Sequence, residues 1–181
     1  MERNDYDLIY KLVIVGDSGV GKTSFLSKFC DRYFPEEHFT TISPTFKNKI
    51  IKVQDKKIKL QIWDMPGYGS LGEKIKSYII GAHGIILMYD VTDENSFNNI
   101  RNWIAQIEKY LEYGVCIILV GNKSDKLNEI ITEKEGKTLA DEFNMSFFES
   151  SAKNTENVDE VFNSITNEIL NKRAKQVMSP D

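Results

Sequence analysis

The stretch GDSGVGKT, residues 16–23, matches the pattern G-x-x-x-x-G-K-[ST] in full. It directly follows an apolar run and opens a segment with helical patterning, which is the context in which this pattern predicts a phosphate-binding loop. The glycines let successive backbone N–H groups turn toward phosphate oxygens, while Lys22 carries a charge to the β and γ phosphates and the Thr23 hydroxyl suits Mg²⁺. The residues predicted to bind nucleotide in this loop are Asp17, Ser18, Gly19, Val20, Gly21, Lys22, Thr23 and Ser24.

Two later loops indicate which base is bound. In NKSD, Asn122 can pair with the edge of a purine, and the Asp125 carboxylate can accept both N1–H and N2–H of guanine, a donor pair that adenine lacks. In SSAKN, the N–H of Ala152 can donate to guanine O6 while Lys153 packs its stem along the base. Because they follow a phosphate-binding loop in this order, the motifs predict a guanine nucleotide and disfavour a kinase or an ATPase. The predicted base site also includes Lys123 and Ser151.

Composition limits the possible partners of the chain. Its 181 residues are enough for one α/β domain with a proper core. Lys and Arg number 23 and Asp and Glu 27, so the formal net charge is −4 and there is no global basic field to attract nucleic acid. Cys30 and Cys116 lie among apolar neighbours and are expected to be buried, reduced thiols, which fits a cytoplasmic protein. No apolar run approaches the ~20 residues of a membrane-spanning helix.

Strand-length apolar runs alternate with helical patterns along the chain. Three of the runs are nearly continuous in Val, Ile and Leu, as in parallel strands covered on both faces, and two alternate in polarity and predict a hairpin with an edge strand. The predicted strands span 9–16, 48–55, 56–64, 84–90, 115–121 and 145–151, and the predicted helices span 22–31, 70–80, 95–113, 132–143 and 157–175.

This order of elements predicts an α/β P-loop NTPase fold. The expected sheet is doubly wound and six-stranded, mostly parallel with one antiparallel edge strand, and is covered by about five helices. Such a sheet binds its ligand beyond the carboxyl ends of its strands, where the three motifs also lie. We expect a single domain over residues 1–175 and a flexible C-terminal tail over 176–181.

The motifs, together with KLQIWD and GAHGIILMYDVTDENSFNNI, resemble those of the Ras superfamily of small GTPases and, within it, the Rab proteins, over about residues 8–172. The resemblance implies a monomeric switch that binds GTP or GDP with Mg²⁺ and acts in vesicle traffic. Its partners would be effector proteins, an exchange factor and a GTPase-activating protein. The residues that fall where Rab proteins have an effector-contacting aromatic triad are Phe46, Trp63 and Tyr78.

The resemblance also assigns the first switch segment. Phe34 falls where the family has an aromatic ring that packs edge-on against the base, and Thr41 where it has the threonine that binds Mg²⁺ and the γ-phosphate. The next residues, ISPTF, differ from the usual Rab sequence IGVDF. Because Pro44 fixes its own φ and lacks an N–H, we expect this segment to be stiffer and its effector face to be altered.

The second switch departs further from the family. WDMPGYGS falls where relatives have D-T-A-G-Q-E, so Asp64 is expected to hold Mg²⁺ through a water and the Gly67 N–H to meet the γ-phosphate. Tyr68 replaces the glutamine that orients the attacking water. An amide can accept and donate at once, whereas a phenol has one O–H on a rigid ring, so Tyr68 is a poor substitute. The predicted catalytic residues are Lys22, Thr41, Gly67 and Tyr68, and the predicted metal-binding residues are Thr23, Thr41 and Asp64.

Two functions remain open at this point. The first is a Rab-like GTPase with slow but real hydrolysis, or with a water-positioning residue supplied elsewhere by the chain or by a partner. The second is a pseudo-GTPase, a guanine-nucleotide-binding interaction module whose hydrolysis is too slow to matter.

Membrane attachment also remains open. Rab proteins usually end in prenylated cysteines, whereas this chain has no cysteine after Cys116. Either a lipid-bearing tail is missing from the chain, the chain is part of a larger polypeptide, or the protein carries no lipid. We expect a cytoplasmic protein, on the cytosolic face of endomembranes only if such a tail exists.

Overall fold

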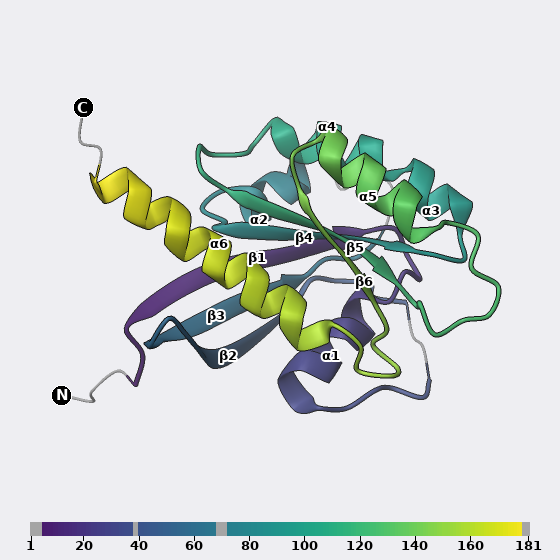
Figure 1. Cartoon of the computed structure of the whole chain (residues 1–181), viewed down its shortest axis with the longest axis horizontal. Coiled ribbons are helices and arrows are strands. Elements are labelled where there is room, and N and C mark those ends of the chain that lie inside the picture. Colours follow the sequence, from purple (N-terminus) through teal and green to yellow (C-terminus); the bar gives the residue numbers. More distant parts are fainter. Residues whose placement is uncertain (1–4, 38–39, 68–71, 179–181) are drawn as a thin grey trace.

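The computed structural model describes residues 5–37, 40–67 and 72–178. Their core is a six-stranded sheet of order β2-β3-β1-β4-β5-β6, in which β2 pairs antiparallel with β3 and every other pairing is parallel (Figure 1). This confirms the predicted α/β fold with one antiparallel edge strand. The strands are β1 (Leu8–Gly16), β2 (Thr45–Val53), β3 (Lys56–Asp64), β4 (Gly84–Asp90), β5 (Cys116–Asn122) and β6 (Ser146–Ser150).

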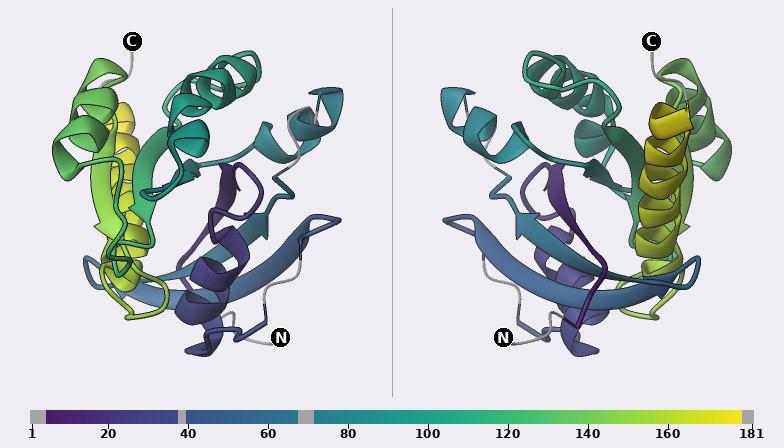
Figure 2. Two further views of the ribbon diagram at one scale, coloured as in Figure 1. Left: turned by 90° about the vertical axis from the view of Figure 1, so that its right-hand side faces the viewer. Right: turned by 90° about the vertical axis from the view of Figure 1, so that its left-hand side faces the viewer.

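Helices cover both faces of the twisted sheet (Figure 2). Along β1, Leu12 and Ile14 pack in one core with the first and last helices, while Val13 and Val15 pack in a second core on the other face. This explains why residues 12–15 of β1 are all apolar, since neither face of the strand meets water there. The helices are α1 (Lys22–Asp31), a 3₁₀ helix η1 (Gly72–Ile75), α2 (Lys76–Ile79), α3 (Glu94–Asn98), α4 (Ile100–Glu108), α5 (Glu133–Glu142) and α6 (Val158–Met178).

The hairpin between β2 and β3 is tighter than predicted. β2 was expected at 48–55 but occupies Thr45–Val53, and Gln54 and Asp55 form the turn with φ of 50° and 62°. Two consecutive left-handed residues make the kind of two-residue turn that matches the twist of paired strands. Every other strand begins and ends within one residue of its predicted limits.

Two predicted helices are broken. Residues 72–79 of the predicted helix 70–80 form a 3₁₀ turn followed by the short α2, which ends where Ile80 takes up an extended ψ of 130°. The predicted helix 95–113 is divided at Asn99 into α3 and α4 and stops at Glu108. The Asn99 side chain bonds to other residues here, and such polar contacts compete with regular helix structure.

The last helix is longer than predicted. α6 runs to Met178, so residues 176–178 are helical and are not part of the tail expected over 176–181. Its final turns contain good helix formers and no glycine, and the first proline after it is Pro180. None of the helices built by the described residues has the length and apolar character needed to cross a bilayer. Cys30 and Cys116 are free thiols, of which Cys116 is buried and Cys30 only half-buried.

Candidate nucleotide site

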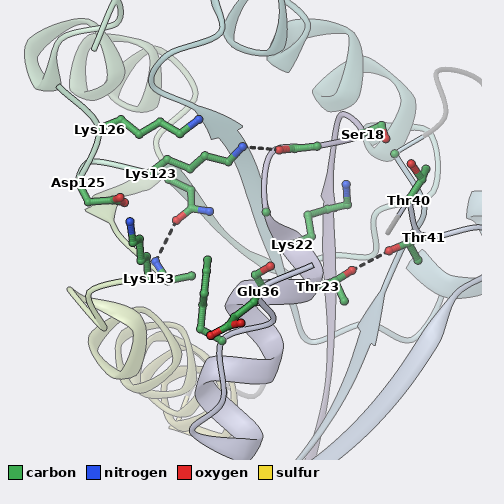
Figure 3. A pocket seen from close by; sticks show the side chains of 17 residues that line it. Ser18, Lys22, Thr23, Glu36, Thr40, Thr41, Lys123, Asp125, Lys126 and Lys153 are labelled. Atoms are coloured by element: carbon green, nitrogen blue, oxygen red, sulfur yellow. Dashed lines mark hydrogen bonds between the residues drawn. The ribbon is translucent and has the colours of Figure 1, made fainter. Parts of the chain in front are cut away.

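A cavity of about 940 Å³ lies beyond the carboxyl ends of the parallel strands. Figure 3 shows Lys22, Thr23 and Thr41 along one part of it and Lys123, Asp125 and Lys153 along another. The structure therefore brings the predicted phosphate, metal and base residues to one place. The other predicted residues that line the cavity are Ser18, Gly19, Gly21, Ser24, Phe34, Gly67, Asn122 and Ala152.

The phosphate-binding loop is fixed by its glycines and by Lys22. A Cβ at Gly16 would lie 2.2 Å from the carbonyl oxygen of Met88, so only glycine fits at the end of β1. Lys22 opens α1, is 5% exposed, and donates from Nζ to the carbonyl oxygens of Gly16 and Asp17 at 2.8 and 2.7 Å. Burial lowers the pKa of Lys22 to about 8, against the opposing charges of Asp64 and Asp17. An anion in the cavity would favour the charged lysine and stabilise this arrangement.

The predicted metal residues meet at one point. The Thr23 hydroxyl lies 2.7 Å from the Thr41 hydroxyl and donates to Asp64 Oδ2 at 2.5 Å. The other oxygen, Asp64 Oδ1, is buried and has no hydrogen-bond partner among the described residues. Burial raises the pKa of Asp64, while the hydrogen bond from Thr23 and the charge of Lys22 act in the opposite direction. Two hydroxyls and an unpartnered carboxylate oxygen fit a hard divalent cation such as Mg²⁺.

The unusual ISPTF segment also reaches this point. Thr45, which begins β2, lies opposite Asp64 in the hairpin, and its hydroxyl is 3.4 Å from Asp64 Oδ2. The Rab pattern has an aspartate at this position, so the chain places a neutral donor beside Asp64 where relatives of that pattern have a second carboxylate. The hydrogen bond from Thr45 acts to lower the pKa of Asp64, against the effect of burial. A second negative charge at this position would instead raise the pKa further.

The start of the second switch is packed onto the phosphate-binding loop. Met65 is fully buried among Val13, Ile75 and Ile79, and Pro66 is buried beside it. The Ser18 N–H donates to the carbonyl oxygen of Gly67 at 3.1 Å, and a Cβ at Gly67 would lie 2.0 Å from the Ser18 nitrogen. Gly67 can approach this closely only because it lacks a side chain. Tyr68, which follows, lies outside the described residues.

The Asp17 side chain faces away from the cavity. Its Oδ1 accepts hydrogen bonds from Asn99 Nδ2 at 2.6 Å and from Trp103 Nε1 at 2.7 Å, so the carboxylate ties the phosphate-binding loop to α4. Val20 is likewise buried in the core between α1 and α6. Of the predicted nucleotide-binding residues in this loop, Asp17 and Val20 can contribute only their backbone.

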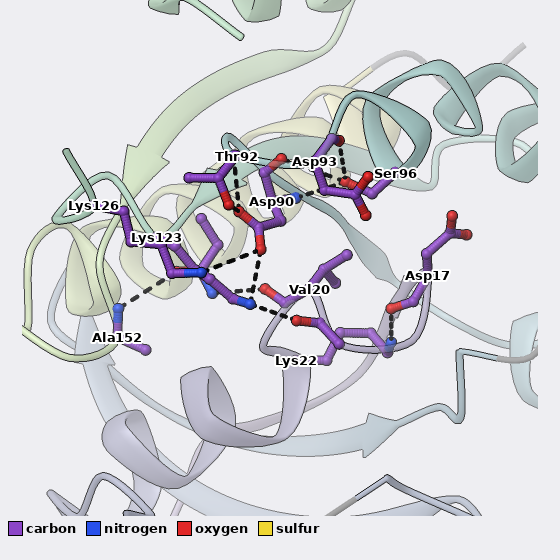
Figure 4. Close-up of polar contacts among 12 residues, drawn as sticks. Asp17, Val20, Lys22, Asp90, Thr92, Asp93, Ser96, Lys123, Lys126 and Ala152 are labelled. Atoms are coloured by element: carbon purple, nitrogen blue, oxygen red, sulfur yellow. Dashed lines mark hydrogen bonds and ion pairs between the residues drawn. The ribbon is translucent and has the colours of Figure 1, made fainter. Parts of the chain in front are cut away.

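The NKSD loop holds the phosphate-binding loop from the other side (Figure 4). Asn122 was predicted to meet the base, but its Nδ2 donates to the Val20 carbonyl at 2.9 Å and its Oδ1 accepts from Ala152 N–H at 3.4 Å. Lys123 Nζ donates to the Gly19 carbonyl at 2.6 Å and pairs with Asp90 at 2.8 Å. The amide of Asn122 therefore connects three segments of the site.

Asp90 was not among the predicted site residues. It ends β4, and although burial raises its pKa, the hydrogen bonds from Lys123 and Thr92 outweigh that effect and the net pKa is lowered. Its position at the carboxyl end of a buried strand is the signal that could have identified it. The cavity also includes three residues that the sequence did not indicate, Glu36, Thr40 and Lys126.

The base end of the cavity is arranged around Asp125. Asp125 Oδ1 accepts a hydrogen bond from the Ser151 hydroxyl at 2.6 Å, and the N–H of Asn154 donates to the same hydroxyl at 3.0 Å. Lys153 is exposed at the cavity edge, and Phe34 is half-buried against the core at the opposite wall. A carboxylate held in this way has oxygen lone pairs left for the paired donors of guanine.

The three predicted aromatic residues are in contact. The ring centroids of Phe46 and Trp63 are 4.8 Å apart, and those of Trp63 and Tyr78 are 5.2 Å apart with the rings nearly edge-on. Phe46 is 41% exposed, while Trp63 and Tyr78 are half-buried. They join the hairpin to α2.

Comparison with known proteins places the chain in a family. A sequence model of the Ras family matches residues 11–171. The chain is 48% identical over 174 residues to Ras-related protein RAB1BV of Beta vulgaris, which covers 95% of this chain and 81% of that protein. It is 43% identical over 173 residues to Ras-related protein RIC1 of Oryza sativa subsp. japonica, and this alignment covers 95% of this chain and 86% of that protein. It is 42% identical over 166 residues to GTP-binding protein ypt1 of Schizosaccharomyces pombe, and this alignment covers 91% of this chain and 82% of that protein.

The chain therefore belongs to the Ras family of small GTPases. Its similarity to proteins with Rab and Ypt names makes it a Rab-like member of that family. Family membership supports GTP hydrolase activity, and the comparisons give no support to the pseudo-GTPase alternative.

Proposed function

We propose that this chain is a molecular switch that binds GTP or GDP with Mg²⁺ at the cavity, hydrolyses GTP slowly, and meets effectors in vesicle traffic through Phe46, Trp63 and Tyr78. One observation carries the proposal: Asp64 Oδ1 is buried without a partner beside the hydroxyls of Thr23 and Thr41. An unpartnered buried carboxylate oxygen is costly, and a cation at this point would remove the cost.

Each part of the site has a role in this proposal. Bound Mg²⁺ would neutralise charge on the phosphates and orient them. Lys22 would carry its charge to the β and γ phosphates, the Gly67 N–H would donate to the γ-phosphate, and Asp125 would select guanine. The donors surrounding the γ-phosphate stabilise the negative charge of the transition state, which is the main contribution of a protein to phosphoryl transfer.

Slow hydrolysis is expected because the residue at position 68 is tyrosine. Glutamine would accept from the attacking water while donating toward the phosphate, and a phenol cannot do both in the same geometry. Met65 and Pro66 further fix the start of the segment, because both are buried against the fold. An activating protein that works by orienting a glutamine would find none in this chain at position 68.

Single-turnover hydrolysis tests the proposal. The protein is loaded with GTP and Mg²⁺, stoichiometric binding is confirmed, and phosphate release is followed for the wild type and for Tyr68→Gln. Tyr6→Gln is the matched control, because Tyr6 precedes the end of β1 remote from the phosphate-binding loop. We expect slow release from the wild type and the control, and faster release from Tyr68→Gln.

Other outcomes separate the parts of the proposal. If neither the wild type nor Tyr68→Gln releases phosphate while GTP stays bound, the result supports nucleotide binding and contradicts hydrolysis. Brisk release by the wild type would show that the account of Tyr68 is wrong. The effector surface is tested separately, by comparing the proteins captured by the GTP-analogue and GDP forms of the wild type and of Trp63→Ala.

A proposed cellular location follows from the same role. An effector-binding switch of vesicle traffic would act in the cytoplasm, on the cytosolic face of endomembranes when a lipid or another attachment is present. We also propose that residues 1–175 form one domain, monomeric in solution, which size-exclusion chromatography of the GDP form tests directly.

A further inference from the structure

A second cavity, of about 210 Å³, lies at the amino ends of the parallel strands, away from the nucleotide site. One wall is the C-terminal half of α6, which in Figure 1 runs from the neighbourhood of α1 to the opposite end of the sheet. The other walls are the loop that precedes β4 and the loop that precedes β5. The lining residues used below are His83, Glu112, Tyr113, Lys172, Arg173 and Gln176.

Neither cation of this cavity has a carboxylate partner among residues 5–37, 40–67 and 72–178. Lys172 Nζ donates to the Val115 carbonyl at 3.2 Å and also interacts with the Cys116 side chain. The Arg173 guanidinium lies over the Tyr10 ring, 5.3 Å from its centroid, and makes no hydrogen bond or ion pair with the part of the chain that the structure describes. Both side chains are exposed on α6, and they line a cavity that is partly open to solvent.

The single carboxylate of the cavity is already engaged elsewhere. Glu112 Oε1 accepts the Gly81 N–H at 3.3 Å, and within residues 5–37, 40–67 and 72–178 it forms no ion pair with Lys172 or Arg173. Two cations and one carboxylate leave the cavity with an excess of positive charge. Guanidinium presents several N–H donors in a fork that matches the oxygens of phosphate.

His83 adds a neutral donor. Its Nδ1 accepts the Lys11 N–H at 2.9 Å, which assigns the remaining ring hydrogen to Nε2. Burial and the charges of Arg173 and Lys11 lower the pKa of His83 to about 4, so the ring is neutral at pH 7. A neutral imidazole can donate to an anion without adding a third positive charge to the cavity.

Three exposed apolar side chains belong to the segments that form this cationic cavity. Tyr113 is 96% exposed, and Val177 and Met178 are 81% and 83% exposed. Val177 lies one helical turn beyond Arg173, so the two share a face of α6. Large apolar side chains next to cations are the combination that favours an anionic membrane surface over water, because the rings and chains enter the interface while the charges meet head groups.

We propose that the cavity between α6 and the loops before β4 and β5 binds the phosphate monoester of an anionic lipid head group. This binding is independent of the nucleotide site, which lies at the other end of the strands. It attaches the described domain to a membrane surface through its own residues.

The test uses the full chain in its GDP form and vesicles of phosphatidylcholine containing a phosphatidylinositol monophosphate. Sedimentation measures binding to these vesicles, to pure phosphatidylcholine, and to phosphatidylserine vesicles of equal surface charge, which lack a phosphate monoester. Arg173→Gln is compared with Lys175→Gln, because both remove one positive charge from α6 but Lys175 does not line the cavity. Nucleotide binding and circular dichroism confirm that each variant is folded.

We expect binding to the phosphoinositide vesicles to exceed that to the phosphatidylserine vesicles. We expect a loss of about tenfold for Arg173→Gln, the size of one charge-assisted hydrogen-bonding group, and less than about twofold for Lys175→Gln. Equal losses for the two variants would mean that only general charge attraction acts, and this overturns the proposal. Absence of binding to every vesicle overturns it as well.

A second arm distinguishes the source of the phosphate. Titration with inorganic phosphate and with soluble inositol monophosphate is followed through the His83 ring signals by NMR, in the wild type and in Val177→Ser/Met178→Ser. The proposal expects weak binding of the soluble ligands, unchanged by the double substitution, and vesicle binding reduced by it. Tight binding of a soluble phosphate, with vesicle binding unaffected by the double substitution, would replace the lipid with a free phosphate compound.

Discussion

Trp103 Nε1 donates to Asp17 Oδ1 at 2.7 Å, and this hydrogen bond ties α4 to the phosphate-binding loop. Trp103 is 2% exposed, whereas Asp17 is half-buried at the start of the loop. The loop that is predicted to hold the phosphates is therefore positioned from outside the nucleotide cavity.

Trp103→Phe keeps an aromatic ring in the core and removes this donor. We expect a loss of about 2 kcal/mol in the free energy of unfolding and several-fold faster GDP release, because a charged acceptor loses one of its two donors. Stopped-flow release of a fluorescent GDP measures the effect, with Trp63→Phe, the same exchange in the aromatic triad, as control. An unchanged release rate would show that the bond does not position the loop.

Replacing Gly136 in α5 with alanine is expected to destabilise the protein, although this substitution normally stabilises helices. Gly→Ala in a helix gains about 1 kcal/mol, but here the Cβ would lie 2.3 Å from the Tyr89 hydroxyl and 2.5 Å from the Phe147 ring. We expect Gly136→Ala to destabilise the protein by about 1–3 kcal/mol, and Tyr89→Phe, which removes the nearest atom, to restore part of the loss. Urea unfolding of the two single variants and the double variant measures the coupling, and additive effects would contradict it.

Glu149 gives the stability a defined pH dependence. Burial, followed by the charges of Glu129, Glu133 and Glu156, raises the pKa of Glu149 to about 7, and it faces Tyr89 on β4. Because the folded protein favours the protonated form, its stabilising contribution is complete below about pH 4.5 and is lost as the pH rises through 7.

Glu149→Gln should therefore be more stable than the wild type at pH 8, by an amount on the order of 1 kcal/mol after screening by solvent, and equal to it near pH 4. Thermal unfolding across this range measures the difference. Glu160→Gln removes an exposed carboxylate from α6 and should show no such pH-dependent gain. A constant difference at all pH values would rule out titration of Glu149 as the cause.

Met65 is expected to anchor the second switch through its side chain. Met65→Thr restores the residue of the family pattern but leaves a gap among Val13, Ile75 and Ile79 and buries a hydroxyl. We expect a loss of about 1–3 kcal/mol in the free energy of unfolding. Ile42→Thr, at a site that is 83% exposed in the first switch, should change stability by less than about 0.5 kcal/mol.

Much of this site was predictable because its residues follow strands. GDSGVGKT begins at the last residue of β1 and NKSD at the last residue of β5, so the sheet alone brings Lys22 and Asp125 to one cavity. The residues that hold these motifs are harder to predict, because they contact loops that lie far away in the sequence. Asp90 could have been identified from its place at the end of β4, but the helical pattern does not indicate that Asn99 and Trp103 bond to Asp17. The breaks at Asn99 and Ile80 are likewise not contained in a helical pattern.

The bonds from Asn122 and Lys123 to the carbonyls of Val20 and Gly19 have a consequence for biosynthesis. A chain leaves the ribosome from its N-terminus, so residues 16–23 emerge long before the two side chains that hold them. β1 also needs β4 as a neighbour in the middle of the sheet. A nascent chain shorter than about 125 residues would carry the phosphate-binding sequence without its folded shape, and nucleotide could assist folding only at a late stage of translation.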